Sequence, residues 1–234
     1  AYGSLASLNV PNTLANPKLT GGMRTELEYG LELKFLQNRL GLDFTYFDRE
    51  DSNLPVAITA AGSTGYTGLN VNSKITSSTG VEVMVSGTPI VNDNLRWDVS
   101  VNFATLKKTV DFIYDGIERN ILDSWLSWSS MDLQEIVGQE WGMLYGRKRL
   151  KDDNGNWVYY ASGNHRYENN QLLGNLMPDY TGGITSTLQY KNWDFAVGID
   201  FQEGGLYHSV TDMFSMAAGL HEWTAGVNDK GNPK

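Results

Sequence analysis

The sequence has no cysteine among its 234 residues, only three histidines and no long apolar run. The lack of cysteine excludes thiol catalysis, disulfides and cysteine-based metal sites. No stretch approaches the roughly 18 consecutive apolar residues of a membrane helix, so no helix of this sequence is expected to span a bilayer. Positive charge is also scarce. With 18 Lys and Arg against 27 Asp and Glu, the net charge is −9, which argues against a nucleic-acid partner.

Catalytic and metal-binding motifs are absent from the sequence as well. The histidines, His165, His208 and His221, are dispersed without metal-ligand spacing. There is no P-loop, no dinucleotide-binding glycine pattern and no Gly-x-Ser-x-Gly nucleophile motif. We therefore predict no catalytic residue, no metal and no cofactor, and a protein that is not an enzyme.

What the sequence does contain is alternation with a period of two. From Thr25 to Phe35 the odd positions are Thr or large apolar residues, and the even positions are charged residues or glycine. Successive side chains of a strand point to opposite faces, so one face of this strand is apolar and the other is charged. The run is close to the roughly 9–11 residues with which a tilted strand crosses a bilayer.

Five further segments alternate in the same way, and short breaks join the six into three hairpins. The predicted strands are residues 24–37, 40–48, 79–87, 96–105, 180–190 and 194–202. Long loops at about 48–78 and 106–178 connect the hairpins. Short turns on one side and long loops on the other are typical of outer-membrane barrels. The predicted fold class is therefore all-β, an antiparallel transmembrane β-barrel segment with long extracellular loops.

Aromatic residues and chain ends refine this prediction. Large aromatics near strand ends are typical of membrane-interface girdles, and they are Tyr46, Phe47, Trp97, Phe103, Tyr180, Tyr190 and Trp193. Residues 1–23 are expected to be a leading segment or loop, and residues 24–234 a partial barrel. Because the polar tract at 225–234 contains no closing strand, we expect a longer chain. A frayed terminus on a complete domain is the alternative.

Two sets of candidate site residues follow. The first lies on the polar side of the alternation and is predicted to line an aqueous lumen: Glu26, Glu28, Glu32, Glu82, Asp98, Asp200 and Gln202. The second gathers aromatics of the long loop as a ligand or partner surface: Trp125, Trp128, Trp141, Tyr145 and Trp157. Apolar spacing from Ile121 to Ile136 predicts one short loop helix, with Asp132 and Glu135 as a capping pair. Asn154-Gly155 predicts a hairpin turn within residues 151–157.

A series of short motifs resembles a known family. In order along the chain, the matching runs are residues 16–20, 28–32, 38–47, 78–83, 87–90, 97–103, 173–175, 178–183, 190–192 and 200–205. Each run is weak alone, but together and collinear they resemble SusC/RagA-type TonB-dependent outer-membrane transporters. Residues 20–24 depart from the pattern, because Thr-Gly-Gly-Met-Arg replaces the expected Lys-Pro-Glu.

The resemblance implies a bacterial outer-membrane location and a 22-stranded barrel, of which this chain supplies a late portion. Six to eight strands cannot close such a barrel, because two unpaired edges would face lipid. The implied partners are the bilayer, the remaining barrel and plug, a SusD-like lipoprotein, TonB through a region absent here, and an oligosaccharide or peptide substrate. A soluble extracellular β-sandwich that binds carbohydrate through Trp125, Trp128 and Trp141 is the alternative, and an acidic β-jelly-roll glycosidase is a third reading.

Overall fold

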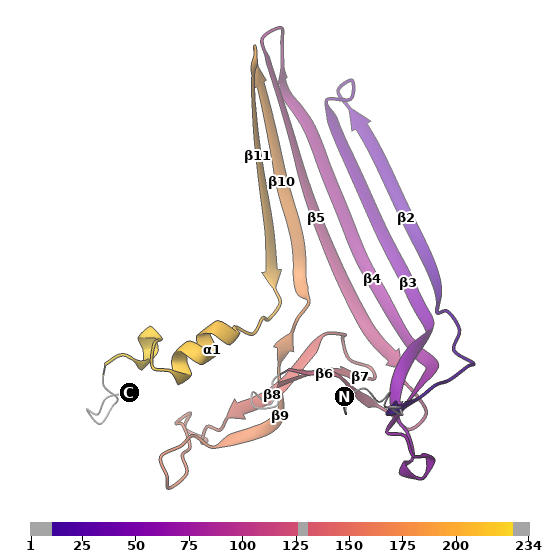
Figure 1. Ribbon diagram of the computed structural model, residues 1–234. Coiled ribbons are helices and arrows are strands. Elements are labelled where there is room, and N and C mark those ends of the chain that lie inside the picture. The colour runs from indigo at the N-terminus through magenta and orange to yellow at the C-terminus, as the bar shows by residue number, and fades with distance from the viewer. Residues whose placement is uncertain (1–10, 126–130, 227–234) are drawn as a thin grey trace, which may run out of the picture.

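The computed structural model describes residues 11–125 and 131–226, and its main feature is a tall antiparallel sheet (Figure 1). Six long strands lie in the order β11-β10-β5-β4-β3-β2, and we call them the wall. Their bounds are β2 Met23–Phe35, β3 Leu40–Thr59, β4 Gly68–Val91, β5 Leu95–Phe112, β10 Pro178–Tyr190 and β11 Trp193–Gly204. A two-residue strand, β1 Thr13–Leu14, pairs in parallel with the start of β4. The predicted fold class is confirmed.

Short turns join β2 to β3, β4 to β5 and β10 to β11 at one end of the wall, at the top of Figure 1. The first of them contains three consecutive residues with positive φ, at positions 36–38, and closes with Arg39 N–H donating to the Leu36 carbonyl at 3.2 Å. The Arg39 guanidinium also donates to the carbonyls of Thr88 and Pro89, at 2.9 and 2.6 Å. Neighbouring hairpins are therefore tied together at this short-turn end.

The two faces of the wall differ in chemistry because every strand alternates in the same phase. Directly opposed residues share a face. One row across all six strands is Leu31, Phe44, Val83, Phe103, Gly182 and Phe201, and the next is Leu33, Leu42, Val85, Val101, Ile184 and Ile199. Gly182 is not a break in the first row, because the Phe201 ring occupies the space that a Cβ would need. One whole face is thus apolar.

No second layer covers this apolar face within the described residues. Leu27 and Val197 are 55% and 58% exposed, and Leu33 and Val99 are only half-buried. The chain exposes 16864 Å², whereas a compact monomer of this mass exposes about 10,500 Å². A soluble sandwich needs a second sheet over these side chains, so the structure argues against that alternative.

The wall is also open at its sides. In the part of the chain that the structure describes, β2 and β11 end the strand order and each pairs with one neighbour only. Unpaired edges of this length attract further strands. The described residues therefore form a sector of a larger sheet and not a closed barrel.

A second sheet lies across the end of the wall opposite the short turns, at the bottom of Figure 1. We call it the loop sheet. Its strands are β6 Arg119–Trp125, β7 Met131–Ile136, β8 Met143–Arg149 and β9 Tyr167–Asn175. Backbone bonds attach it to β5, among them Trp141 N–H to the Lys108 carbonyl at 2.8 Å and Val110 N–H to the Gln139 carbonyl at 3.0 Å.

The small apolar core of the described chain lies where the loop sheet meets the wall. Val56, Val110 and Ile113 form its buried centre. Partly buried apolar residues pack around them: Ile58, Val71, Tyr114, Ile117, Val137 and Trp141. The wall has its packed core at this loop end only, and farther along its height the apolar side chains face outward.

Three elements differ from the sequence predictions. The wall strands run well into the ranges predicted as loops, since β3 continues to Thr59 and β5 to Phe112. The predicted helix within 121–136 is wrong, because this segment forms β6 and β7, which pair with each other. Asp132 accepts from Ser124 Oγ at 2.6 Å across that hairpin instead of capping a helix. The capped helix of the described residues is α1 Val210–Ala217, where Ser209 Oγ accepts from Asp212 N–H at 3.1 Å.

The remaining helical elements are two short 3-10 turns, η1 Gly62–Thr64 and η2 Glu222–Thr224. Among the described residues, no helix is long and apolar enough to cross a membrane.

Candidate functional site

The polar face of the wall is where the register brings the predicted lumen residues. One row across the six strands is Gly30, Thr45, Glu82, Ala104, Thr181 and Gln202, and the next is Glu32, Asp43, Met84, Asn102, Gly183 and Asp200. Glu26, Glu28 and Asp98 have the same parity on their strands. All seven predicted residues therefore share one face, although far apart in sequence.

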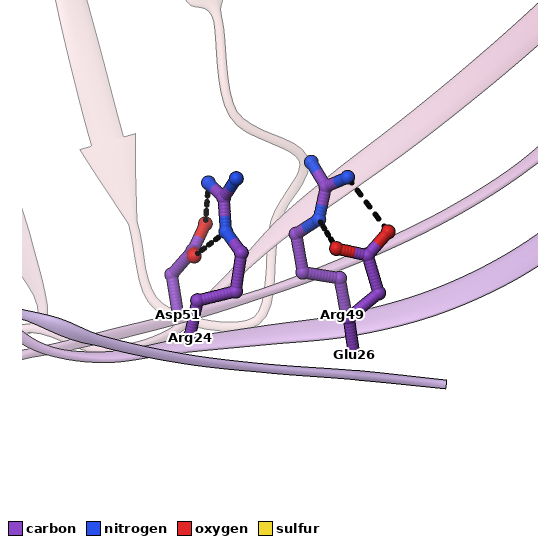
Figure 2. A network of polar contacts seen from close by, with 4 residues as sticks. All are labelled: Arg24, Glu26, Arg49 and Asp51. Carbon is purple, nitrogen blue, oxygen red and sulfur yellow. Dashed lines mark hydrogen bonds and ion pairs between the residues drawn. The ribbon is translucent and has the colours of Figure 1, made fainter. Parts of the chain in front are cut away.

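Two arginine–carboxylate pairs lie side by side at the loop end of this face (Figure 2). Arg24 Nε and Nη2 donate to the two oxygens of Asp51 at 2.6 and 3.2 Å. Arg49 Nε and Nη2 donate to the two oxygens of Glu26 at 3.0 and 2.9 Å. Bidentate contacts of this kind fix the relative orientation of the two side chains as well as pairing their charges. They join β2 to β3 and neutralise Glu26.

A hollow of about 430 Å³ lies beside these pairs. The ring of Phe47 forms part of its lining, with the Arg49 guanidinium 5.1 Å from the ring centroid. Phe47 can lie against the wall because Gly80 opposes it, where a Cβ would come within 2.4 Å of the ring. The prediction that Phe47 belongs to an interface girdle is wrong, since it is 7% exposed and on the polar face.

The charge of the hollow is set by which carboxylates are paired. Glu28 and Glu82 line it and have no ion pair or hydrogen bond with a described side chain. Glu26 is paired as described, and Thr45 and Thr181 also line the hollow. The hollow is therefore net negative, and its lining combines polar groups with apolar side chains such as Phe47. It suits water and solutes rich in hydroxyl or amide groups.

The other predicted lumen residues lie farther along the polar face. Asp98 is held at the short-turn end, where it accepts from Arg96 Nε at 2.6 Å and from Thr88 Oγ1 at 2.6 Å. Glu32 pairs with Lys34 on its own strand at 2.5 Å. Asp200 and Gln202 lie on β11, exposed and without a side-chain partner in the described part of the chain. The face thus combines structural and free polar groups.

The five predicted loop aromatics do not share one environment. Trp141 packs on the small core and donates from Nε1 to Glu135 Oε1 at 3.1 Å. Tyr145 is buried and donates to Gln139 Oε1 at 3.0 Å. Trp157 is 43% exposed, on the hairpin between β8 and β9. Trp128 and the side chain of Trp125 lie outside the described residues.

Comparison with known proteins agrees with this geometry. The chain is 23% identical over 207 residues to TonB-dependent receptor P26 of Formosa agariphila, which covers 78% of this chain and 20% of that relative. It is 24% identical over 197 residues to TonB-dependent receptor SusC of Bacteroides thetaiotaomicron, covering 79% and 20%. The RagAB peptide importer in its open-open state matches the fold with a TM-score of 0.65 at 15% identity, covering 82% of this chain and 21% of that one.

The predicted resemblance to SusC/RagA-type TonB-dependent receptors is confirmed. No family model matches the sequence. The SusC-like chain spans about a fifth of the length of the curated relatives it matches. Its localisation is the bacterial outer membrane, the location of these relatives. An open sheet of six wall strands is the form expected for one sector of such a barrel.

Sequence reasoning missed the arginine pairs of this SusC-like sector. Alternation gave no signal past the predicted end at residue 48, because residues 48–53 of β3 are all polar. Reading the strand to its true end brings Arg49 opposite Glu26 and Asp51 opposite Arg24. The Gly80–Phe47 contact had no local signal, because it depends on cross-strand register.

Proposed function

We propose that this chain is part of a SusC-like TonB-dependent transporter that imports an oligosaccharide or peptide across the outer membrane. In the proposal the wall is a sector of the barrel, with its apolar face toward lipid and its polar face toward the lumen. The short turns face the periplasm and the loop sheet faces outside. TonB supplies energy through a region outside this chain, and a SusD-like lipoprotein covers the outer opening.

One observation carries the proposal: apolar rows and polar rows cross all six wall strands in a single phase, with the apolar face uncovered. A strand crossing a membrane as part of a barrel must satisfy both lipid and water, and alternation is how it does so. A soluble domain that left a face of this size bare would aggregate. Lipid is the environment in which that face is stable.

The seven polar residues named above are proposed to line the lumen. Glu28 and Glu82 support this role most directly, because both are unpaired and border the 430 Å³ hollow. Glu26 would serve mainly to hold β2 against β3 through Arg49, and Asp98 to hold β5 against β4 through its hydrogen bond from Thr88. A solute passing the wall would then meet carboxylates and hydroxyls in a water-filled channel.

The test is uptake by cells that carry the complete receptor. Deleting its gene is expected to abolish growth on one glycan or peptide source and leave growth on simple sugars intact, and deleting TonB is expected to have the same effect. Glu28→Gln with Glu82→Gln is expected to lower uptake while the amount of receptor in the outer membrane stays normal. Two results would contradict the proposal: a receptor found in the soluble fraction, or a deletion strain that takes up every tested glycan and peptide as well as the parent strain does.

A further inference from the structure

The hairpin between β8 and β9 carries an unusual concentration of positive charge. Residues 147–168 contain five of the chain's 18 cations and only three of its 27 carboxylates. The segment is therefore net positive in a chain of net charge −9. The five cations are Arg147, Lys148, Arg149, Lys151 and Arg166, and none of them forms an ion pair with a residue that the structure describes. Their charge is available to a ligand.

Backbone hydrogen bonds order the hairpin between β8 and β9. Three short segments lie side by side, joined by Val158 N–H to the Leu150 carbonyl at 3.0 Å and Arg166 N–H to the Val158 carbonyl at 2.9 Å. The predicted turn is present, closed by Gly155 N–H on the Asp152 carbonyl at 2.9 Å. The backbone therefore holds the side chains at fixed places.

One of the two carboxylates in this turn, Asp152, is already engaged. Asp152 Oδ1 accepts from the backbone N–H of Asn156 at 2.8 Å and of Asn154 at 2.9 Å. The Asn156 backbone N–H, followed by its side-chain amide, holds the pKa of Asp152 below its usual value. Its oxygens are bound to the turn's own amides, and it forms no ion pair with a described cation.

One face of the hairpin brings cations and aromatic rings together. Bridge pairing places Lys151 opposite Trp157 and Tyr159 opposite His165, and opposed residues share a face. We call Arg149, Lys151, Trp157, Tyr159 and His165 the tip face. Lys151 Nζ lies 4.3 Å from the Trp157 ring centroid and Arg149 Cζ lies 6.0 Å from it. Tyr159 and His165 are 4.6 Å apart between centroids.

The tip face has room for a ligand because its rings are only half covered. Trp157 is 43% and Tyr159 51% exposed. Exposed aromatic planes next to unpaired cations match a molecule that has both flat apolar ring faces and negative charge. A sugar ring that carries carboxylate or sulfate has both. A peptide carboxylate would use the cations and leave the rings without a partner.

We propose that the tip face binds anionic saccharides, carboxylated or sulfated, at the outer side of the barrel. This inference rests on the proposed function, because it names a substrate class for a transporter whose loop sheet faces outside. The rings of Trp157 and Tyr159 stack on the saccharide, and Arg149 and Lys151 bind its acidic groups. Binding weakens as salt is raised, because exposed charges are screened.

The opposite face of the same hairpin supplies a matched control. Tyr160 is 54% exposed and carries Arg166 5.7 Å from its ring centroid. Tyr160→Ala with Arg166→Gln removes one ring and one cation, as does Trp157→Ala with Lys151→Gln. Each double variant removes one aromatic ring and one positive charge, and the two act on opposite faces of the hairpin.

The test is saccharide binding to the complete receptor in detergent. Probes are tetragalacturonate, its uncharged methyl ester, a sulfated carrageenan tetrasaccharide and oligoglutamate. At least one of the two anionic saccharides is expected to bind, with Kd raised about tenfold by the tip-face double variant and less than about twofold by the control. The methyl ester and oligoglutamate are expected to bind at least about tenfold more weakly than the anionic saccharide that binds.

Three results would overturn the proposal: no binding of either anionic saccharide, equal losses in the two double variants, or equal binding of oligoglutamate or the methyl ester. The assay needs no TonB, so it separates the two proposals. If the receptor binds the saccharide through the tip face but cells take up no substrate, the transport proposal is contradicted and this inference stands. If cells take up substrate normally and the tip-face double variant binds the saccharide with an unchanged Kd, this inference is contradicted and the transport proposal stands.

Discussion

The wall and the loop sheet are both built of β-strands, but the wall exposes large apolar side chains and the loop sheet buries several of its own. Wall strands leave large side chains such as Leu31 and Ile199 more than half exposed, while Leu144 and Met131 of the loop sheet are buried. The loop sheet also buries polar groups, since Gln134 and Glu135 are 2% and 0% exposed. A strand in water needs a packed core, whereas a strand in lipid does not. The difference shows that solvent dictates which side chains these strands cover.

Besides the backbone bonds and the small core, a buried ion pair joins the two regions. Lys74 of β4 lies 2.9 Å from Glu135 of β7, and Trp141 donates to the same carboxylate oxygen. A second pair, Lys107 with Glu140, links the same regions at 3.1 Å but is exposed. These pairs allow the comparison to be tested at the junction itself.

The largest effect is expected from Lys74→Met. It leaves the Glu135 carboxylate buried without its counter-charge, which costs about 3–5 kcal/mol. The loop sheet should then detach from the wall, seen as faster hydrogen exchange in β7 of the complete receptor while β4 stays protected. Lys107→Met is the control and should cost at most about 1 kcal/mol, because its pair is exposed. Equal destabilisation by the two substitutions would show that the Lys74–Glu135 pair is no more buried than the Lys107–Glu140 pair, contrary to the structure.

The next effect concerns the lipid face of the wall. Leu31→Arg, near the middle of β2, is expected to cost about 2–4 kcal/mol in the complete barrel. Glu28→Arg on the polar face of the same strand should be nearly silent. Urea unfolding of the receptor in lipid vesicles measures both. Equal tolerance at the two positions would refute the assignment of faces.

A smaller effect is expected on the polar face, where Gly80 makes room for Phe47. Gly80→Ala would place a Cβ 2.4 Å from the Phe47 ring and 2.5 Å from the Thr105 carbonyl oxygen, and such overpacking costs about 1–3 kcal/mol. Gly30 shares this face with nothing within 4 Å, so Gly30→Ala is the matched control. The same unfolding assay applies. A silent Gly80→Ala would mean that Phe47 lies elsewhere.

Much of the wall could be predicted from sequence, because alternation is a local property. The phase of Thr25 to Phe35 determines which side chains share a face, and pairing with β3 preserves that phase. The strand ends were harder. Residues 48–53 of β3 are polar on both faces, so the alternation stops there, and it is cross-strand partners on β2 that stabilise Arg49 and Asp51.

The loop sheet could not be predicted in the same way. Its residues satisfy helical spacing and strand pairing about equally, and contact with the wall decides between them, as the pairing of Glu135 with Lys74 shows. The polar face of the wall could be predicted from alternation, but the division of its carboxylates into paired and unpaired ones could not. That division depends on which residues the register places opposite, as with Glu26 and Arg49.

The central claim is that one face of the wall contacts acyl chains and the other contacts water. The most direct test places nitroxide spin labels singly at residues 81–86 of β4, a central strand, in the complete receptor in lipid vesicles. Collision with oxygen, which concentrates in lipid, should peak at Val81, Val83 and Val85. Collision with a water-soluble nickel chelate should peak at Glu82, Met84 and Ser86. Valine positions that the chelate reaches, or that both reagents fail to reach, would contradict the account.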